Sequence, residues 1–116
     1  MKRLWVSILV TFCAGVFAQG APIKIGEINS YSSMPQFTTP YRQGWQLAVE
    51  EINAKGGLLG RKVEVVARDD AGKPEEALRH AIELTSLEHV DVLAGGFLSN
   101  VGLALADYAL KNKRLF

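Results

Sequence analysis

The sequence contains a single cysteine, Cys13, among its 116 residues. This cysteine lies within an apolar run that begins near the N-terminus at Leu4. Attachment of a lipid would want a small residue immediately before the cysteine, and Phe12 occupies that position. No cysteine follows position 13, so a disulfide framework and a cysteine-based zinc site are both excluded from the rest of the chain.

The sequence also lacks an excess of either charge. Removing Lys2 and Arg3 from the thirteen basic residues leaves eleven against twelve acidic ones. A nucleic-acid-binding domain is expected to carry a basic patch, and binding to anionic membranes needs a polybasic cluster. The near balance of charge therefore points to neither nucleic acid nor a lipid surface as a partner.

Nucleotide-binding motifs are missing as well. A dinucleotide site needs a glycine-rich turn after the first strand, but the only glycine in that region is Gly26, inside the strand itself. A P-loop is excluded because no Gly-Lys-Ser or Gly-Lys-Thr occurs. Asp69 and Asp70 stand where such folds carry a ribose-binding acid, but without the glycines we expect them to stabilise the following turn and helix start. No cofactor is expected.

Signs of a catalytic site are weak. Ser99 lies at a strand-to-helix turn, where a hydrolase nucleophile would lie, but that motif needs glycine two residues before and after. Phe97 and Val101 occupy those positions. The only histidines, His80 and His89, are expected at the surface and away from the carboxyl edge of the sheet. The sequence thus predicts a protein that is not an enzyme and has no metal site. Ser99 remains open to two interpretations, a helix N-cap alone or an N-cap that also contacts a ligand.

The first eighteen residues have the organisation of an export signal. Lys2 and Arg3 form a basic start, an apolar run follows, and Val16 and Ala18 occupy the −3 and −1 positions of a cleavage site. This pattern predicts a cleavable signal peptide over residues 1–18, with cleavage after Gly20 as the alternative. A membrane anchor is disfavoured because the uncharged run is shorter than the roughly 20 residues that cross a bilayer.

The remainder alternates between strands and helices. Apolar, β-branched segments at residues 23–28, 63–67 and 90–94 predict strands. Helical patterns follow each of them, the second opened by Pro74 and the third capped by Ser99 or Asn100. This order predicts an α/β fold with a three-layer parallel sheet. Leu115 and Phe116 begin what reads as another buried strand, so the chain is expected to be truncated.

The first helix has the clearest periodicity. Apolar residues at i, i+3, i+4 and i+7 predict one buried stripe, formed by Trp45, Ala48, Val49 and Ile52. Thr39 is expected as the N-cap with Pro40 in the first turn. Gly56 and Gly57 are expected to end the helix, because glycine accepts the left-handed conformation of a C-cap.

The longest connection, residues 30–38, leaves the carboxyl end of the first strand. Ligands in open α/β sheets bind at that edge. Tyr31 and Phe37 lie in this connection, where aromatic side chains either pack onto the domain or line a ligand pocket. The first interpretation is the default, and the second stays open.

Residues 41–61 carry a run that resembles branched-chain amino-acid-type periplasmic binding proteins. The pattern G-x-x-L-A-V-E-E-I-N-x-x-G-G-x-x-G-R, characteristic of that family, begins here at Gly44 and ends at Arg61. The Asp69-Asp70 pair followed by Pro74, and the turn that reaches Ser99, also fall where the family has them. The resemblance spans residues 23–116.

The resemblance implies a bilobal, type 1 binding protein that captures a small solute in the periplasm and delivers it to the membrane permease of an ABC importer. Residues 19–116 would be the N-terminal part of its first lobe, with the membrane approached only through the permease. The resemblance also implies a ligand-binding set at Ser99, Asn100, Tyr31 and Phe97, with Ser99 holding the carboxylate of the ligand. A ligand-sensing regulator of the amide-sensor type is the alternative on the same fold.

One departure from the family pattern concerns the ligand. Many amino-acid binders carry a run of serines or threonines where this chain has Leu98-Ser99-Asn100-Val101-Gly102. The expected ligand therefore ranges from an amino-acid-like solute to another carboxylate, an amide or an aromatic acid.

Overall fold

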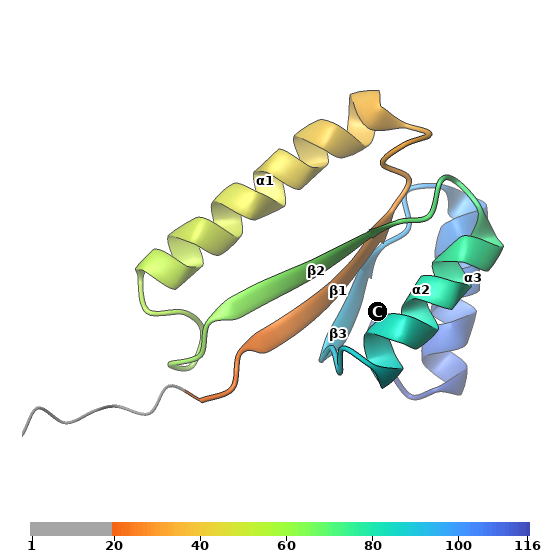
Figure 1. The fold of residues 1–116 in the computed structure, drawn as a ribbon. Coiled ribbons are helices and arrows are strands. Elements are labelled where there is room, and N and C mark those ends of the chain that lie inside the picture. The colour runs from red at the N-terminus through yellow and green to blue at the C-terminus, as the bar shows by residue number, and fades with distance from the viewer. Residues whose placement is uncertain (1–19) are drawn as a thin grey trace, which may run out of the picture.

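The computed structural model describes residues 20–116, so the predicted signal peptide over residues 1–18 lies outside the described residues. Strands and helices alternate along this part, in the order β1 (Ile23–Asn29), α1 (Pro35–Ala54), β2 (Val63–Asp69), α2 (Pro74–Ser86), β3 (Val92–Gly95) and α3 (Ser99–Lys111). Helix α1 covers one face of the sheet, and α2 and α3 cover the other (Figure 1). The predicted three-layer α/β fold is confirmed. Within residues 20–116, no helix is both long and apolar enough to cross a membrane.

The three strands are parallel and pair in the order β2-β1-β3. At the free edge of β3, Val92 forms an isolated parallel bridge with Leu115, and the Leu93 N–H donates to the Leu115 carbonyl at 2.9 Å. This bridge places Leu115 beside β3, where the sequence predicts the start of a further strand. Its predicted burial is wrong for the described residues, because Leu115 is 72% exposed and Phe116 is 46% exposed.

The face of the sheet under α2 and α3 holds the apolar core. Its buried side chains come from β1, the β3 region and both helices, namely Ile28, Ala77, Ala81, Leu84, Val90, Leu93, Val101 and Leu105, and Val66 of β2 packs against them partly buried. Gly26 of β1 makes room for them, since a Cβ there would meet Leu84, Val90 and Leu93 side chains at 3.0, 3.1 and 3.2 Å. The buried residues of α2 are Ala77, Ala81, Leu84 and Thr85, and those of α3 are Val101, Leu105 and Ala109. Each fully buried Leu or Val contributes about 1.5–3 kcal/mol relative to an exposed one.

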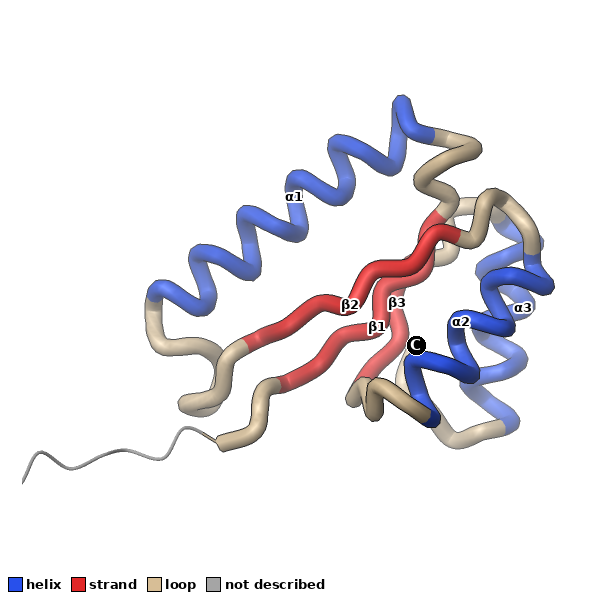
Figure 2. Tube along the Cα trace, viewed as in Figure 1, coloured by secondary structure: helices blue, strands red, loops and turns tan. Residues whose placement is uncertain are grey.

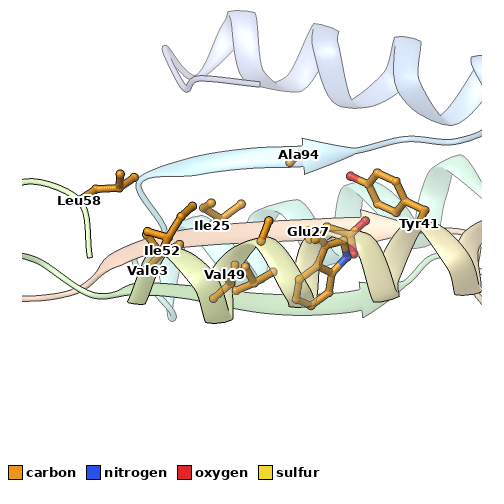
Figure 3. Close-up of a pocket in the computed structure, with 11 residues that line it drawn as sticks. Ile25, Glu27, Tyr41, Val49, Ile52, Leu58, Val63 and Ala94 are labelled. Carbon is orange, nitrogen blue, oxygen red and sulfur yellow. The ribbon is translucent and has the colours of Figure 1, made fainter. Parts of the chain in front are cut away.

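The face under α1 is packed less completely. The predicted stripe of Trp45, Ala48, Val49 and Ile52 does face the strands, but it lines a hollow of about 270 Å³ (Figure 3). Its three larger side chains are half-buried and Ala48 is exposed, so the prediction of a buried stripe is wrong. The hollow persists because short side chains such as Ala48 and Ala94 line it from opposite layers.

Helix α1 begins earlier than its sequence suggested. Met34 is its N-cap, Pro35 occupies the first turn, and Pro40 lies inside the helix, so the predicted start at Thr39 is wrong. The Met34 carbonyl accepts from the N–H groups of Phe37 and Thr38, both at 3.1 Å, and from the Thr38 hydroxyl at 3.0 Å. These bonds build a first turn ahead of Pro40, which has no N–H to continue the ladder.

Candidate ligand-binding site

The loops that leave the three parallel strands gather at one end of the sheet (Figure 2). The connection after β1 is tied to the connection after β2 by side chains. The Ser30 hydroxyl donates to Asp70 Oδ1 at 2.7 Å, and the Ser32 N–H donates to Asp69 Oδ1 at 3.2 Å. These bonds join two of the three loops of the carboxyl edge into one unit.

The two acids also shape their own turn, as the sequence predicts. The Ala71 N–H donates to Asp69 Oδ1 at 3.0 Å, and the Gly72 N–H donates to Asp70 Oδ1 at 2.7 Å. Partial burial by itself would raise the pKa of the Asp69 carboxyl, but the hydrogen bonds from Ser32 and Ala71 outweigh it and lower that pKa. Helix α2 then begins at Pro74, with Glu75 and Glu76 in its first turn.

Gly95 and Gly96 carry the chain out of β3. The φ of Gly95 is 112°, and a Cβ on Gly95 would lie 1.9 Å from the Ile28 carbonyl oxygen. The Gly96 N–H donates to the same oxygen at 2.8 Å. Only glycine can therefore hold this close approach between the end of β3 and β1.

Helix α3 starts directly after this turn. Leu98 is its N-cap in extended conformation, and no side chain caps the helix, so the prediction that Ser99 or Asn100 is the cap is wrong. The Gly102 N–H donates to the Leu98 carbonyl at 2.8 Å. The helix therefore begins ahead of both residues that were predicted to cap it. Ser99 and Asn100 are instead exposed in the first helical turn. First-turn N–H groups have no intrahelical acceptor, and the positive end of the helix dipole favours an anion there.

An aromatic hollow opens beside the start of α3. Phe97 stacks on Phe37 with ring centroids 5.4 Å apart and an interplanar angle of 20°. Both rings are partly open to solvent, Phe97 at 44% and Phe37 at 52% exposure. Together with Tyr41, Asn29 and Gly95 they line a space of about 210 Å³, which we call the aromatic hollow. The prediction of Phe97 as a ligand contact stays a prediction, but its ring does border an open apolar space.

Tyr31 does not line that hollow. Its hydroxyl donates to Glu27 Oε2 at 2.6 Å and accepts from Trp45 Nε1 at 3.3 Å, while the Arg42 guanidinium lies 5.0 Å from its ring centroid. Burial, followed by the hydrogen bond to Glu27, raises the pKa of the Tyr31 phenol. The hydroxyl is therefore engaged within the domain, as the default interpretation expects, and a role in ligand contact stays untested.

Glu27 is the residue that sequence reasoning missed. It lies on the α1 face of β1 and is only 2% exposed (Figure 3). Burial raises the pKa of its carboxyl, against the lowering effect of hydrogen bonds from Tyr31 and Asn29. The sequence did carry a sign of this residue. Ile23 and Ile25 point to one face of the strand, so the next position on that face is expected to be apolar, but it holds the acid Glu27.

The two histidines behave differently from one another. His80 Nε2 lies 3.1 Å from the Asp69 carbonyl oxygen, at the carboxyl end of β2, and His80 Nδ1 lies 3.6 Å from Glu83 Oε2. The expectation that neither histidine approaches this edge is wrong for His80, because the first turns of α2 pass beside the end of β2. His89 is exposed before β3, as expected. Among the described residues, no hydrogen bond joins His80 to Ser99, and no cluster of acids and histidines could hold a metal ion.

The architecture and the edge geometry agree with one sequence family. The profile of the periplasmic binding proteins matches residues 22–116. The chain belongs to the periplasmic binding protein family. The resemblance found in the sequence is thereby confirmed, and this is a family of solute-binding proteins that its name assigns to the periplasm.

Named periplasmic binding proteins are similar to this chain over most of its length. The Leu/Ile/Val-binding protein homolog 7 of Brucella melitensis is 35% identical over 107 residues, which cover 91% of this chain and 27% of that protein. The chain spans about a quarter of the length of such relatives.

Two solved structures of this family agree in fold. The branched-chain amino acid transporter substrate-binding protein LivJ of Streptococcus pneumoniae, in complex with isoleucine, is 35% identical, with a TM-score of 0.72 over 78% of this chain and 26% of that chain. An ABC transporter solute-binding protein of Rhodopseudomonas palustris, in complex with 3,4-dihydroxybenzoic acid, is 28% identical, with a TM-score of 0.65 over 81% of this chain and 25% of that one. The same fold thus serves an aliphatic amino acid in one protein and an aromatic acid in the other.

Proposed function

We propose that the protein is the solute-binding component of an ABC importer, which captures a small solute in the periplasm and passes it unchanged to a membrane permease. Membership of the periplasmic binding protein family supports this proposal. The relatives add to it, because they are described as binding proteins or as transporter components. Residues 1–18 act as the export signal in this proposal, which accounts for their basic start and apolar run.

The observation that carries the proposal is the open start of α3. Ser99 and Asn100 are exposed, no side chain caps the helix, and the helix begins at the carboxyl edge where α/β folds bind ligands. We assign this helix end to the carboxylate of the solute, with the Ser99 hydroxyl as a further donor. Helix N-termini bind anions through their free N–H groups and dipole.

The aromatic hollow narrows the class of solute. Its walls are mainly the rings of Phe37, Phe97 and Tyr41, with Asn29 as the polar side chain. Such a space suits a flat ring or a branched aliphatic group attached to the carboxylate. Phe97 is then the residue that contacts the apolar part of the solute, and Tyr31 supports the loop beside it.

Catalysis does not fit the same residues. Ser99 has no elbow glycines around it and no hydrogen-bonded histidine among the described residues. A nucleophile needs a base within hydrogen-bond reach. We therefore propose binding without turnover, and no observation favours the alternative of a ligand-sensing regulator.

Isothermal titration calorimetry on the full-length protein tests the proposal, with isoleucine, 3,4-dihydroxybenzoate and acetamide as probes. One of the two carboxylates should bind without product formation. Ser99→Ala should weaken that binding by about 1–3 kcal/mol, because a hydrogen bond to a charged partner is lost. The matched control is Ser86→Ala. Ser86 is exposed at the C-terminal end of α2, so its substitution should leave the affinity unchanged. Absence of binding to every probe, or release of a product, would contradict the proposal.

A further inference from the structure

A polar cluster centred on a buried carboxylate lies on the α1 face of the sheet and shares Asn29 with the aromatic hollow. It consists of Glu27 and Asn29 on β1, Tyr31 in the following loop and Trp45 on α1, and we call it the Glu27 cluster. Asn29 Nδ2 donates to Glu27 Oε1 at 3.1 Å, and the Tyr31 hydroxyl donates to Glu27 Oε2 at 2.6 Å. Trp45 Nε1 donates to the Tyr31 oxygen at 3.3 Å. One carboxylate therefore connects a strand, a loop and a helix.

Packing does not explain an acid at this position. The hollow between α1 and the sheet is lined mostly by apolar side chains, including Ile25 and Val65 on the strands beside Glu27. Burying a carboxylate costs free energy unless it is hydrogen-bonded. Glu27 is 2% exposed, and each of its oxygens accepts one hydrogen bond. An apolar residue would fill the same space without that cost, so the acid needs another reason.

The hydrogen bonds of the Glu27 cluster lead to the edge where the solute is proposed to bind. Asn29 lines the aromatic hollow, and its Oδ1 accepts from the Ser30 N–H at 3.0 Å at the start of the β1–α1 loop. Tyr41 lines both the aromatic hollow and the hollow that contains Glu27. The carboxylate thus fixes one wall residue of the aromatic hollow directly and the loop beside it through Tyr31.

We propose that Glu27 is a positioning residue for solute binding, whose carboxylate holds Asn29 and Tyr31 so that the aromatic hollow is formed before the solute arrives. This inference rests on the proposed function of the same edge. It adds a residue that acts through Asn29, a wall residue of the aromatic hollow, and is separate from the helix end at Ser99. Preorganisation of a site raises affinity because less conformational entropy is lost on binding.

The charge state of Glu27 decides which bonds it makes. As a carboxylate it accepts from both Asn29 and Tyr31, whereas protonation converts one acceptor into a donor and opposes the bond donated by Tyr31. The titratable or charged groups that act on it are Tyr31, Tyr41, Arg42 and Asp70. Burial raises the pKa of Glu27, so the change comes at a higher pH than for an exposed glutamate.

The first experiment measures solute affinity between pH 8 and pH 5 by calorimetry, on the full-length protein with isoleucine and 3,4-dihydroxybenzoate. Glu27→Gln should weaken binding of the probe that the wild type binds by about tenfold, because bonds to a charged acceptor are lost. The affinity of the wild type should fall toward pH 5 as Glu27 is protonated. Glu27→Gln should remove this pH dependence. Glu64→Gln, an exposed acid on the neighbouring strand, should change neither quantity. Tyr31→Phe removes only one hydroxyl and should also weaken binding, which covers the case that Glu27→Gln fails to fold.

The second experiment uses the solute-free protein. Trp45 donates to the Tyr31 oxygen, so its fluorescence should change as Glu27 is protonated. Loss of the signal in Trp45→Phe assigns it, and Glu27→Gln should abolish the pH dependence. Wild-type affinity and pH profile in Glu27→Gln would overturn the positioning role. If no probe binds the wild type, the proposed function fails instead, and an unchanged fluorescence titration in Glu27→Gln would then still overturn the role of the cluster.

Discussion

The face of the sheet under α2 and α3 is closed by apolar side chains, whereas the face under α1 contains a buried carboxylate and a hollow of about 270 Å³. Gly26 and Glu27 are neighbours on β1, yet one lies under tightly packed leucine and valine side chains and the other accepts hydrogen bonds from Asn29 and Tyr31. Alternation of side chains along a strand separates the two environments. One face mainly stabilises the domain, and the other mainly positions the loop at the carboxyl edge.

Two tyrosines make the same contrast. On the closed face, the Tyr108 hydroxyl lies 2.7 Å from the Thr85 hydroxyl and joins α3 to α2. On the α1 face, the Tyr31 hydroxyl bonds a carboxylate at 2.6 Å and accepts from an indole. The first contact links two neutral groups of packed helices, while the second depends on the charge of Glu27. Substitutions on the two faces should therefore affect different measurements.

The largest effect is expected from emptying the closed face. Leu84→Ala removes a side chain that is 0% exposed, and the loss of transfer free energy plus a cavity should lower the free energy of unfolding by about 2–5 kcal/mol. Chemical denaturation measures it. Leu103→Ala, a leucine of α3 that is 73% exposed, is the control and should cost less than about 0.5 kcal/mol. Equal effects would contradict the assignment of the core to this face.

Adding side-chain volume should change the free energy of unfolding in opposite directions on the two faces. Ala48→Leu extends into the hollow under α1 and should stabilise the protein by about 0.5–2 kcal/mol through cavity filling. Ala81→Leu places the same atoms where Ala81 is 0% exposed and should destabilise by about 1–3 kcal/mol through overpacking. Thermal unfolding of both variants provides the comparison. Destabilisation by Ala48→Leu of the same size as that by Ala81→Leu would show that the α1 face is already filled.

The smallest effect on stability is expected from Asp69, at the carboxyl edge of the sheet. The folded-state pKa of Asp69 is lowered, so its carboxylate contributes stability above the ordinary pKa of 3.8, and this contribution is lost as the pH falls through the lowered value. Asp69→Asn should therefore cost less than about 1 kcal/mol at neutral pH, since the group is exposed to screening. Denaturation at pH 7 and again below the lowered pKa checks this, and the difference between variant and wild type should shrink at acid pH. A difference that stays constant with pH would contradict a stabilising role for the Asp69 carboxylate in its bonds to Ser32 and Ala71.

Much of the fold followed from local patterns. Strand and helix alternation predicted the order of elements, and Pro74 marked the start of α2. The starts of α1 and α3 were predicted wrongly. In both cases, the backbone closed the first turn on a residue without a capping side chain, Met34 and Leu98, through carbonyl contacts that the sequence does not encode as a cap.

The candidate site was predictable only as a location. Parallel strands place their carboxyl ends at one edge, so Ser99, Asn100, Phe97 and Tyr31 were expected near it before any coordinates. The stacking of Phe37 on Phe97 was not, because Phe37 lies in the first turn of α1 and Phe97 in the loop after β3, and their contact depends on how α1 sits over the sheet. The direction of the Tyr31 hydroxyl depended in the same way on Glu27.

The sequence by itself determined the family, the α/β layers and the edge at which the connecting loops meet, because periodicity, glycine placement and the run from Gly44 to Arg61 act over short distances along the chain. Only the tertiary structure decided that α1 leaves a hollow and that Glu27 joins Asn29 and Tyr31. These features depend on how closely one layer approaches another and on which buried polar groups find partners. Both are properties of the assembled faces, and no local pattern specifies them.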